Sequence, residues 1–194
     1  MELILASKNA HKAKEMQDIL GDNVALITQD AAGFGDIEVI EDGKTFEENA
    51  IKKAVEIAKI SGKAVIADDS GLCVDALGGR PGVYTARFAG ENATDDQNIS
   101  LLLSKLDGVP TDKRQAKFVC VIALAIPGSE PRTFRGECSG YILTEKRGNN
   151  GFGYDPVFFV PDHQKSMAEL DGKIKNSISH RFNALSKLKS DLNR

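Results

Sequence analysis

Two adjacent acidic residues are the clearest candidates for chemistry in this sequence. Asp68 and Asp69 directly follow the apolar run Ala64–Ala67 and precede Ser70. Such a run predicts a short buried strand, and open α/β sheets usually bind ligands at the carboxyl ends of their strands. Carboxylates placed there suit Mg²⁺, which prefers hard oxygen ligands. Since neighbouring residues of a strand point to opposite faces, we expect one to bind metal and the other to brace the loop. An ordinary Asp-Asp-Ser-Gly turn is an equally good interpretation.

The segment Ser7–Lys12 is a candidate phosphate site. It follows a short apolar run and leads into a helix expected over His11–Leu20, with Asn9 in the capping position. The free N–H groups and positive dipole end of a helix N-terminus favour anions, and Lys8 and Lys12 add positive charge. The segment lacks the GxxxxGK[ST] pattern of a phosphate loop. A capped surface helix with solvated lysines is an equally good interpretation of this motif.

Two later segments carry aromatic and cationic side chains that suit a nucleoside. The glycine-rich segment Asn149–Pro156 contains Phe152 and Tyr154. An aromatic ring flanked by glycines can stack on a base while the backbone approaches closely. A tight turn that buries both rings in the core is the alternative, and chemistry alone slightly favours it. Lys175 and the segment Ser179–Arg181 supply cations that suit carbonyl or phosphate oxygens.

The elements that must position these residues alternate at first between strands and helices and then change to hairpins. This change predicts an α/β fold with a mixed sheet. Capping boxes predict two of the helices, and Gly62 ends the first of them. The predicted elements are helices over Thr45–Ser61, Thr94–Leu106 and Ile178–Leu192, strands over Leu3–Ala6, Ala64–Ala67, Ala116–Ile126, Thr133–Leu143 and Pro156–Val160, and a long loop over Leu77–Gly90.

Composition excludes several classes of protein. The chain has 194 residues, a net charge of −3 and no basic excess, so a dedicated nucleic-acid binder is disfavoured and any bound anion should be small. Its three cysteines are widely separated, which argues against a zinc site or a disulfide framework. No apolar run approaches the roughly 20 residues of a membrane span, and the N-terminus does not resemble a signal peptide. We therefore expect a cytoplasmic protein without a membrane or nucleic-acid partner.

Several of these segments occur together, and in the same order, in one family. The chain resembles the inosine-triphosphate pyrophosphatase family, which hydrolyses noncanonical purine nucleotides, and the match runs nearly from end to end. In place of the Thr-Gly-Asn that usually follows the family's first strand, this chain has Ser7-Lys8-Asn9, which puts a charged side chain where the family has glycine. The matching motifs are Thr45–Ala50, Ala67–Leu72 (ADDSGL), Val74–Tyr84, Ala86–Gly90, Gly151–Phe158 (GFGYDPVF) and Ser179–Arg181.

The resemblance implies an elongated α/β fold around a long, twisted, mixed β-sheet. Residues 1–194 would form a single domain of two lobes with the active-site cleft between them. It further implies a homodimer, a small-molecule nucleotide as substrate and Mg²⁺ as cofactor. The expected reaction converts ITP, dITP or XTP and water into the monophosphate and diphosphate, with attack at the α-phosphorus.

The resemblance also implies roles for individual residues. Asp69 would be the catalytic base and a metal ligand, and Glu41 the second metal ligand. Lys12 and Lys52 would stabilise the departing diphosphate, since phosphoryl transfer is catalysed mainly by positioning and charge neutralisation. The implied substrate-binding residues are Ser7, Lys8, Asn9, Ala10, His11 and Lys12 for phosphate, Asn49, Lys52 and Ser70 lining the site, and Phe152, Gly153, Tyr154, Asp155, Lys175, His180 and Arg181 for base and sugar.

Two other functions stay open at this point. The chain could be a related house-cleaning pyrophosphatase that acts on pyrimidine or methylated nucleotides. It could also be a non-catalytic nucleotide-binding or RNA-binding module of the same fold. The carboxylate set argues against the second, because binding alone does not require it.

Overall fold

The computed structural model describes residues 1–193, except for the side chains of Ala10 and His11. The chain forms two compact units. Unit 1 contains Met1–Asp69, Cys120–Gly136 and the segment from His180 onward, and unit 2 contains Ser70–Val119 and Glu137–Ser179. Three of the four boundaries between the units fall within long strands, and the fourth lies between Ser179 and His180.

Regular structure is distributed over both units. Unit 1 contains β1 (Glu2–Leu5), α1 (Ala10–Leu20), β2 (Ala25–Thr28), α2 (Phe46–Ser61) and α5 (His180–Leu192). Unit 2 contains α3 (Asp95–Lys105), β6 (Phe158–Val160), β7 (Lys165–Ser166) and α4 (Gly172–Ile178). The strands β3 (Val65–Val74), β4 (Gln115–Ala125) and β5 (Arg132–Ile142) are divided between the units. Short 3-10 helices lie at Asp75–Leu77, Gly82–Arg87, Thr111–Lys113, Asp155–Val157, Pro161–His163 and Met167–Glu169.

The strands form a seven-stranded sheet in the order β2-β1-β3-β4-β5-β6-β7. In unit 1, β1 pairs in parallel with β2 and with β3. In unit 2, β5 pairs antiparallel with β6, and β6 antiparallel with β7. The sheet is therefore mixed, as the change from strand–helix alternation to hairpins predicts.

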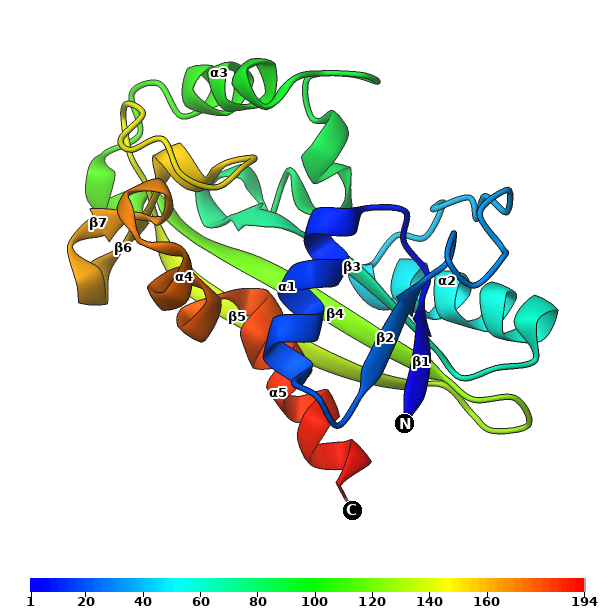
Figure 1. Cartoon of the computed structure of the whole chain (residues 1–194). Helices are drawn as coiled ribbons and strands as arrows, with labels where there is room; N and C mark the ends of the chain where they lie inside the picture. Colours follow the sequence, from blue (N-terminus) through cyan, green and yellow to red (C-terminus); the bar gives the residue numbers. More distant parts are fainter. Residues whose placement is uncertain (194) are drawn as a thin grey trace. The chain divides into compact units, whose positions relative to one another are not determined.

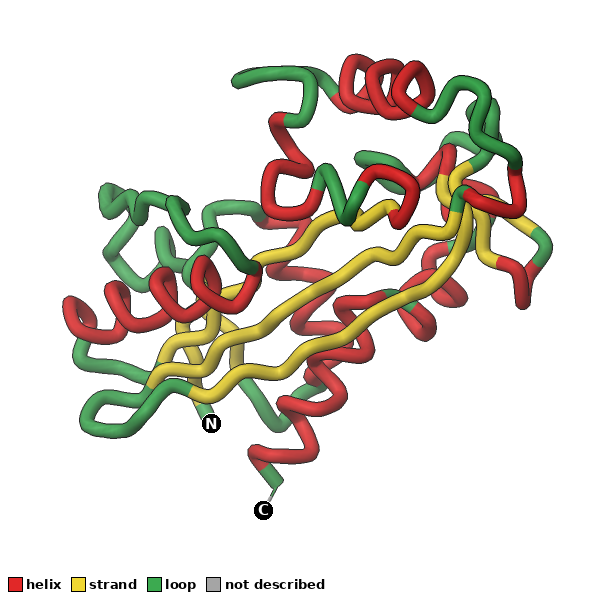
Figure 2. Tube along the Cα trace, turned by 180° about the vertical axis from the view of Figure 1, so that it is seen from behind, coloured by secondary structure: helices red, strands yellow, loops and turns green. Residues whose placement is uncertain are grey.

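Local sequence signals place the helices of unit 1. Asn9 caps α1 by accepting a hydrogen bond from Lys12 N, and Gly21 ends that helix. Thr45 and Glu48 form the predicted capping box of α2, which ends at Gly62 in the left-handed conformation. Helices α1 and α5 lie side by side, and α2 covers the opposite face of the unit 1 strands (Figures 1 and 2).

Each unit has its own apolar core. In unit 1, buried apolar side chains of α1, α5, β1, β3 and β4 form one cluster that includes Met16, Leu185 and Leu3. In unit 2, buried apolar residues of α3, β5 and β6 belong to a second cluster that includes Leu102, Ile142 and Phe158.

The structure corrects several of the predicted elements. The strand predicted to end at Ala67 continues to Val74, so the turn interpretation of Asp68–Gly71 is wrong. These residue types usually form turns, but hydrogen bonds to the neighbouring strands hold them in the extended conformation here. The expected loop over Leu77–Gly90 contains a 3-10 helix, and the last predicted helix is divided at Ser179 into α4 and α5. Strands β2 and β7 and most of α4 were not predicted.

Two further sequence expectations concern membrane helices and thiols. Among residues 1–193, the helices all lack the length and apolar character that crossing a bilayer requires. The three cysteines are free thiols. Burial raises the pKa of Cys120 to about 12 and that of Cys138 to about 11, so both stay protonated and unreactive at neutral pH.

Candidate active site

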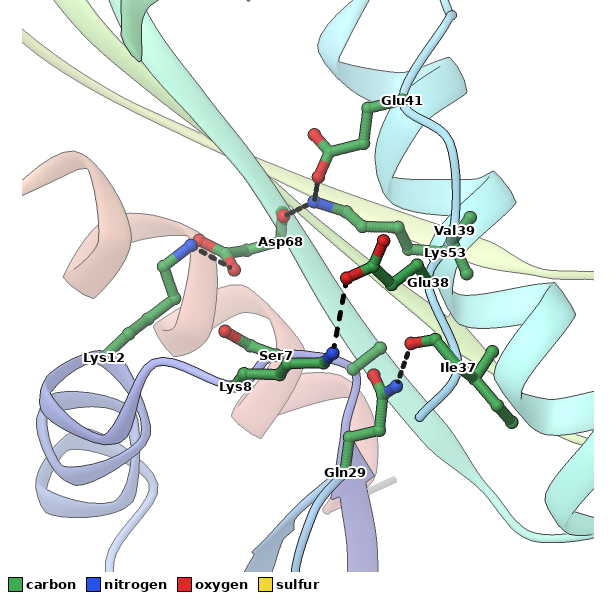
Figure 3. Close-up of a pocket in the computed structure, with 11 residues that line it drawn as sticks. Ser7, Lys8, Lys12, Gln29, Ile37, Glu38, Val39, Glu41, Lys53 and Asp68 are labelled. Atoms are coloured by element: carbon green, nitrogen blue, oxygen red, sulfur yellow. Dashed lines mark hydrogen bonds and ion pairs between the residues drawn. The ribbon is translucent and has the colours of Figure 1, made fainter. Parts of the chain in front are cut away.

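A pocket of about 320 Å³ opens in unit 1 beside the turn between β1 and α1. Residues from four segments line it: the β1–α1 turn and α1, the end of β2 with the loop that follows, α2, and β3 (Figure 3). The lining residues are Ala6, Ser7, Lys8, Lys12, Gln29, Ile37, Glu38, Val39, Glu41, Lys53 and Asp68.

The β1–α1 turn presents the N-terminus of α1 and two lysines. Ser7 Oγ accepts a hydrogen bond from Asn9 N at 3.2 Å, and Asn9 Oδ1 accepts one from Lys12 N at 3.1 Å. These two bonds fix the turn just before the helix. The Lys8 ammonium lies 3.6 Å from the carboxylate of Glu38 on the opposite wall. The predicted phosphate segment therefore lines the pocket with Ser7, Lys8 and Lys12, while the side chains of Ala10 and His11 lie outside the described part.

Asp68 lies on β3 and is the most deeply buried charge of the site, with 1% of its surface exposed. Its Oδ1 is 2.9 Å from Lys12 Nζ, and its Oδ2 is 3.5 Å from a terminal nitrogen of Arg181. Burial alone would raise the pKa of Asp68, but the charges of Lys12, Arg181 and Lys53 hold it well below its usual range. Asp68 is thus an ionised anchor that fixes the pocket's cations.

Asp69, the next residue of β3, does not itself line the pocket and has the opposite electrostatic character. It is buried, and its Oδ2 accepts a hydrogen bond from Asn49 Nδ2 of α2 at 3.0 Å. Burial raises the pKa of Asp69, while Lys53 and the Asn49 bond oppose the rise and the charges of Glu41 and Asp68 add to it. Adjacent strand residues therefore provide one carboxylate that the fold holds ionised and one whose charge the fold disfavours. This contrast is typical of groups with separate tasks.

Lys53 contacts two of the acidic residues that line the pocket. Its Nζ donates to the backbone carbonyl of Asp68 at 2.7 Å and lies 3.0 Å from Glu41 Oε1. Sequence reasoning named Lys52 instead, whose ammonium contacts Asp42 at 2.7 Å and which does not line the pocket. Helix spacing could have indicated Lys53, because it lies four residues after the buried Asn49 and so on the same face of α2.

The donor set fits a magnesium ion better than a metal that needs a complete protein cage. No group of three or more His, Cys, Asp or Glu side chains suited to a metal occurs among residues 1–193. Glu41 and Asp69 instead provide two carboxylates that repel each other electrostatically. Mg²⁺ is usually held by one or two carboxylates together with waters and substrate phosphates. The residues present fit that pattern.

Unit 2 holds the predicted aromatic loop, in which Phe152 and Tyr154 behave differently. Phe152 is 62% exposed, and the Lys175 ammonium lies 4.6 Å from the centroid of its ring. Tyr154 is buried, and its hydroxyl donates to Thr85 O at 2.9 Å. The alternative in which both rings are buried is therefore wrong for Phe152 and right for Tyr154.

Asp155 holds this loop in shape. Its Oδ2 accepts hydrogen bonds from Phe152 N at 3.0 Å and from Lys175 Nζ at 2.6 Å. A Cβ at Gly151, where φ is +81°, would lie 2.0 Å from the same oxygen, so only glycine fits there. Gly153 N donates to Asp95 Oδ2 at 2.7 Å. The exposed ring is thus presented on a fixed backbone with a cation beside it.

The structure brings some of the remaining predicted residues into contact with the pocket's charges. Arg181, in the first turn of α5, is only 3% exposed, and its guanidinium lies 2.9 Å from Glu15 Oε2 as well as close to Asp68. Ser70 follows Asp69 on β3, and His180 is the first residue of α5. Besides Lys53, sequence reasoning missed Gln29 and Glu38, which carry no recognisable motif and come together with the other lining residues only in the folded chain.

Comparisons with known proteins agree with one another. The model of the Ham1 family matches residues 3–191. The chain is 52% identical over 192 residues to the dITP/XTP pyrophosphatase of Shouchella clausii, covering 98% of this chain and 96% of that protein. It is 52% identical over 190 residues to the dITP/XTP pyrophosphatase of Bacillus subtilis, covering 96% and 94%. The solved structure of the Staphylococcus aureus Ham1 protein matches with a TM-score of 0.92 at 46% identity, covering 100% of this chain and 98% of that one.

Proposed function

Because the chain belongs to the Ham1 family, we propose that it hydrolyses dITP, XTP and ITP to the monophosphate and diphosphate with Mg²⁺ as the activating ion. Relatives that match nearly the whole chain are dITP/XTP pyrophosphatases, which supports this proposal. The observation that carries the proposal is the unit 1 pocket. A helix N-terminus, Lys12 and Lys53 provide positive charge there beside the carboxylate of Glu41. Binding a triphosphate together with a metal ion requires both positive charge and carboxylates, whereas binding a nucleotide alone does not require the carboxylates.

The residues of the pocket divide the work of phosphoryl transfer. The N-terminus of α1 and Lys12 bind phosphate oxygens, and Asp68 keeps the Lys12 ammonium in place. Lys53 offers a second cation close to the same groups. Neutralising phosphate charge and fixing the substrate account for most of the catalysis in this class of reaction.

Asp69 and Glu41 are the proposed metal ligands. When bound, Mg²⁺ would polarise phosphate oxygens and lower the pKa of a coordinated water. Asp69 is also the proposed general base, because burial and two neighbouring carboxylates raise its affinity for a proton. Asn49 restricts the Asp69 carboxylate to one orientation through their 3.0 Å hydrogen bond.

The proposed base-binding residues are those of the aromatic loop in unit 2. The exposed Phe152 ring offers a face for stacking on a purine. Lys175 donates beside it and would pair with the carbonyl oxygen at position 6 of hypoxanthine or xanthine, where adenine has an amino group. Leaving a polar group of the site unpaired disfavours the wrong base, so ATP should be a poor substrate.

The motif suggests that Arg181 binds the substrate base, but we propose a different role for it. Its guanidinium is buried and lies close to Glu15 and Asp68. We therefore place it mainly as a support for Asp68. We also propose that the protein is a homodimer and is located in the cytoplasm. Light scattering of the purified protein measures its oligomeric state.

Diphosphate release across a panel of nucleotides tests the proposed function. The panel contains dITP, XTP and ITP, the eight standard nucleotides, and methylated nucleotides, each with Mg²⁺ and with EDTA. We expect release from dITP, XTP and ITP far above GTP, GTP above ATP, and loss of all release in EDTA. Preference for pyrimidine or methylated nucleotides, or the absence of any release, would contradict the proposal.

A further inference from the structure

A short stretch of chain that carries two of the pocket's acidic side chains has little backbone hydrogen bonding of its own. Residues 38–42, which we call the acidic arm, include Glu38 and Glu41. Within the described part of the chain, these five residues form no backbone–backbone hydrogen bond and belong to no helix or strand. The side chains of the arm form ion pairs with three lysines, Glu38 with Lys8, Glu41 with Lys53 and Asp42 with Lys52. The path of its backbone depends on what holds the two ends of the arm.

A buried carboxamide holds each end. Before the arm, Gln29 Nε2 donates to Ile37 O at 2.7 Å and to Phe34 O at 2.8 Å. After the arm, Gly43 N donates to Asn49 Oδ1 at 2.8 Å. Gln29 and Asn49 are 5% and 2% exposed, respectively. The two carboxamides are buried and the bonds themselves partly buried, so breaking the bonds leaves a buried amide that water reaches poorly.

The chemistry of the contacts fixes the orientation of the Gln29 side chain. The carbonyls of Phe34 and Ile37 can only accept hydrogen bonds, so the amide nitrogen must face them and Oε1 must point away. Gln29 lines the pocket together with Ile37 and Glu38 (Figure 3). An apolar residue of the same size would leave Ile37 O without this donor, and Phe34 O would keep only the 3.2 Å hydrogen bond from Ile37 N. The amide at position 29 is thus specifically suited to fix the beginning of the acidic arm.

We propose that Gln29 is a positioning residue that holds the acidic arm and thereby sets the position of Glu41 in the pocket. In the held arm, Glu41 lies 3.0 Å from the Lys53 ammonium. The inference rests on the proposed function, in which Glu41 binds Mg²⁺. Groups that orient a metal ligand without touching the metal typically change metal affinity by about tenfold or more when they are replaced.

A second glutamine of unit 1 provides a matched control. Gln17 Nε2 donates to Gly21 O at 3.0 Å and to Val24 O at 2.9 Å, and its Oε1 accepts from Leu26 N at 2.8 Å. It therefore fixes the α1–β2 connection as Gln29 fixes the acidic arm, but it does not line the pocket. Gln17→Met and Gln29→Met remove the same donors and keep a similar side-chain volume.

Hydrogen exchange in the full-length protein, without metal or nucleotide, tests the structural part. The amides to follow are those of Phe34 and Ile37, which donate to Gln29 O at 3.0 Å and to Phe34 O at 3.2 Å. In Gln29→Met we expect both to exchange about tenfold faster, the effect of losing roughly one buried hydrogen bond. In Gln17→Met they should be unchanged, and the amide of Leu26 should exchange faster instead.

A magnesium titration of dITP hydrolysis tests the functional part. Gln29→Met should raise the Mg²⁺ concentration for half-maximal activity about tenfold, while the rate at saturating Mg²⁺ falls by less than about threefold. Gln17→Met should change neither value. Should Gln29→Met not fold, Gln29→Asn keeps the amide but shortens its reach, and the same two changes should appear at smaller amplitude.

The two measurements separate the possible failures. Unchanged exchange at Phe34 and Ile37 would overturn the role of Gln29 in holding the arm. Faster exchange with an unchanged magnesium requirement would show that Gln29 holds the arm without positioning Glu41, which also overturns the proposal. If the wild-type protein releases no diphosphate from dITP, the proposed function fails, and the exchange data still decide whether Gln29 holds the arm.

Discussion

Asp68→Asn is expected to destabilise unit 1 strongly, although it hardly changes the volume of the side chain. Asp68 is 1% exposed and lies between the ammonium of Lys12, at 2.9 Å, and the guanidinium of Arg181, at 3.5 Å. The substitution removes the negative charge and leaves both cations in place. Arg181 cannot turn towards water, because it is itself only 3% exposed.

The size of the effect follows from the remaining partners. Removing one member of a buried ion pair usually costs about 3–5 kcal/mol, since the other charge stays buried without compensation. Glu15 still lies 2.9 Å from Arg181, and the Lys12 side chain is partly exposed, so the lower end of that range applies. We therefore expect a loss of about 3 kcal/mol at neutral pH. For a chain of this length, this lowers Tm by about 6–12 °C.

The pH dependence has a definite sign. The folded protein lowers the pKa of Asp68 below its unfolded value of 3.8, so the ionised group contributes stability that is fully present above that value. This contribution is lost as the pH falls through the lower, folded pKa. Asp68→Asn lacks it at every pH. Its stability should therefore approach that of the wild type as the pH falls below 3.8.

Urea unfolding of the wild type, Asp68→Asn and Asp69→Asn provides the assay. Asp69 is the matched control, because the fold raises its pKa and so disfavours its charge. Removing that charge should leave the free energy of unfolding within about 1 kcal/mol of the wild type, or raise it. Equal losses in the two variants, or a loss below about 1 kcal/mol in Asp68→Asn, would refute the assignment of Asp68 as the ionised anchor.

Three further predictions concern catalysis. Glu41→Gln should raise the Mg²⁺ concentration for half-maximal activity about 10–100-fold and should lower the rate at saturating Mg²⁺ by a smaller factor. If only the rate falls in a magnesium titration, Glu41 is a general base and not a metal ligand. Lys53→Met should lower kcat/KM for dITP at least about a hundredfold, and Lys52→Met should lower it less than about threefold. A larger loss in Lys52→Met than in Lys53→Met would favour Lys52, which the sequence had indicated. Phe152→Leu should raise KM roughly tenfold for dITP, XTP and GTP alike, and a selective effect on one base in steady-state assays would contradict simple stacking.

Local interactions made much of the fold predictable. The cap at Asn9 and the capping boxes that begin at Thr45 and Thr94 depend on residues three positions apart, and the structure contains all three. The extension of β3 through Asp68–Gly71 could not be predicted in this way. Those residue types prefer turns, and only pairing with distant strands holds them extended. Strand β2 was missed because its four residues have no flanking signal strong enough to define it.

The candidate site was predictable where a motif marks it and unpredictable where distant segments converge. Among the motif residues, Lys12 lines the pocket and Phe152 is exposed on the aromatic loop. Gln29 and Lys53 were missed, because their roles depend on a carbonyl or carboxylate supplied by another segment. Arg181 was predicted as a substrate-binding cation, and its burial beside two carboxylates could not be derived from its place at the start of a helix.

Hydrolysis of dITP in water enriched in ¹⁸O tests the central claim most directly. If water attacks the α-phosphorus, the label enters the monophosphate and the diphosphate carries none. The account predicts this result for the wild type with Mg²⁺. It also predicts that Asp69→Asn, although folded, loses more than about tenfold of the rate, a barrier increase above about 1.4 kcal/mol. Label in the diphosphate, release of inorganic phosphate, or near wild-type turnover by Asp69→Asn would contradict it.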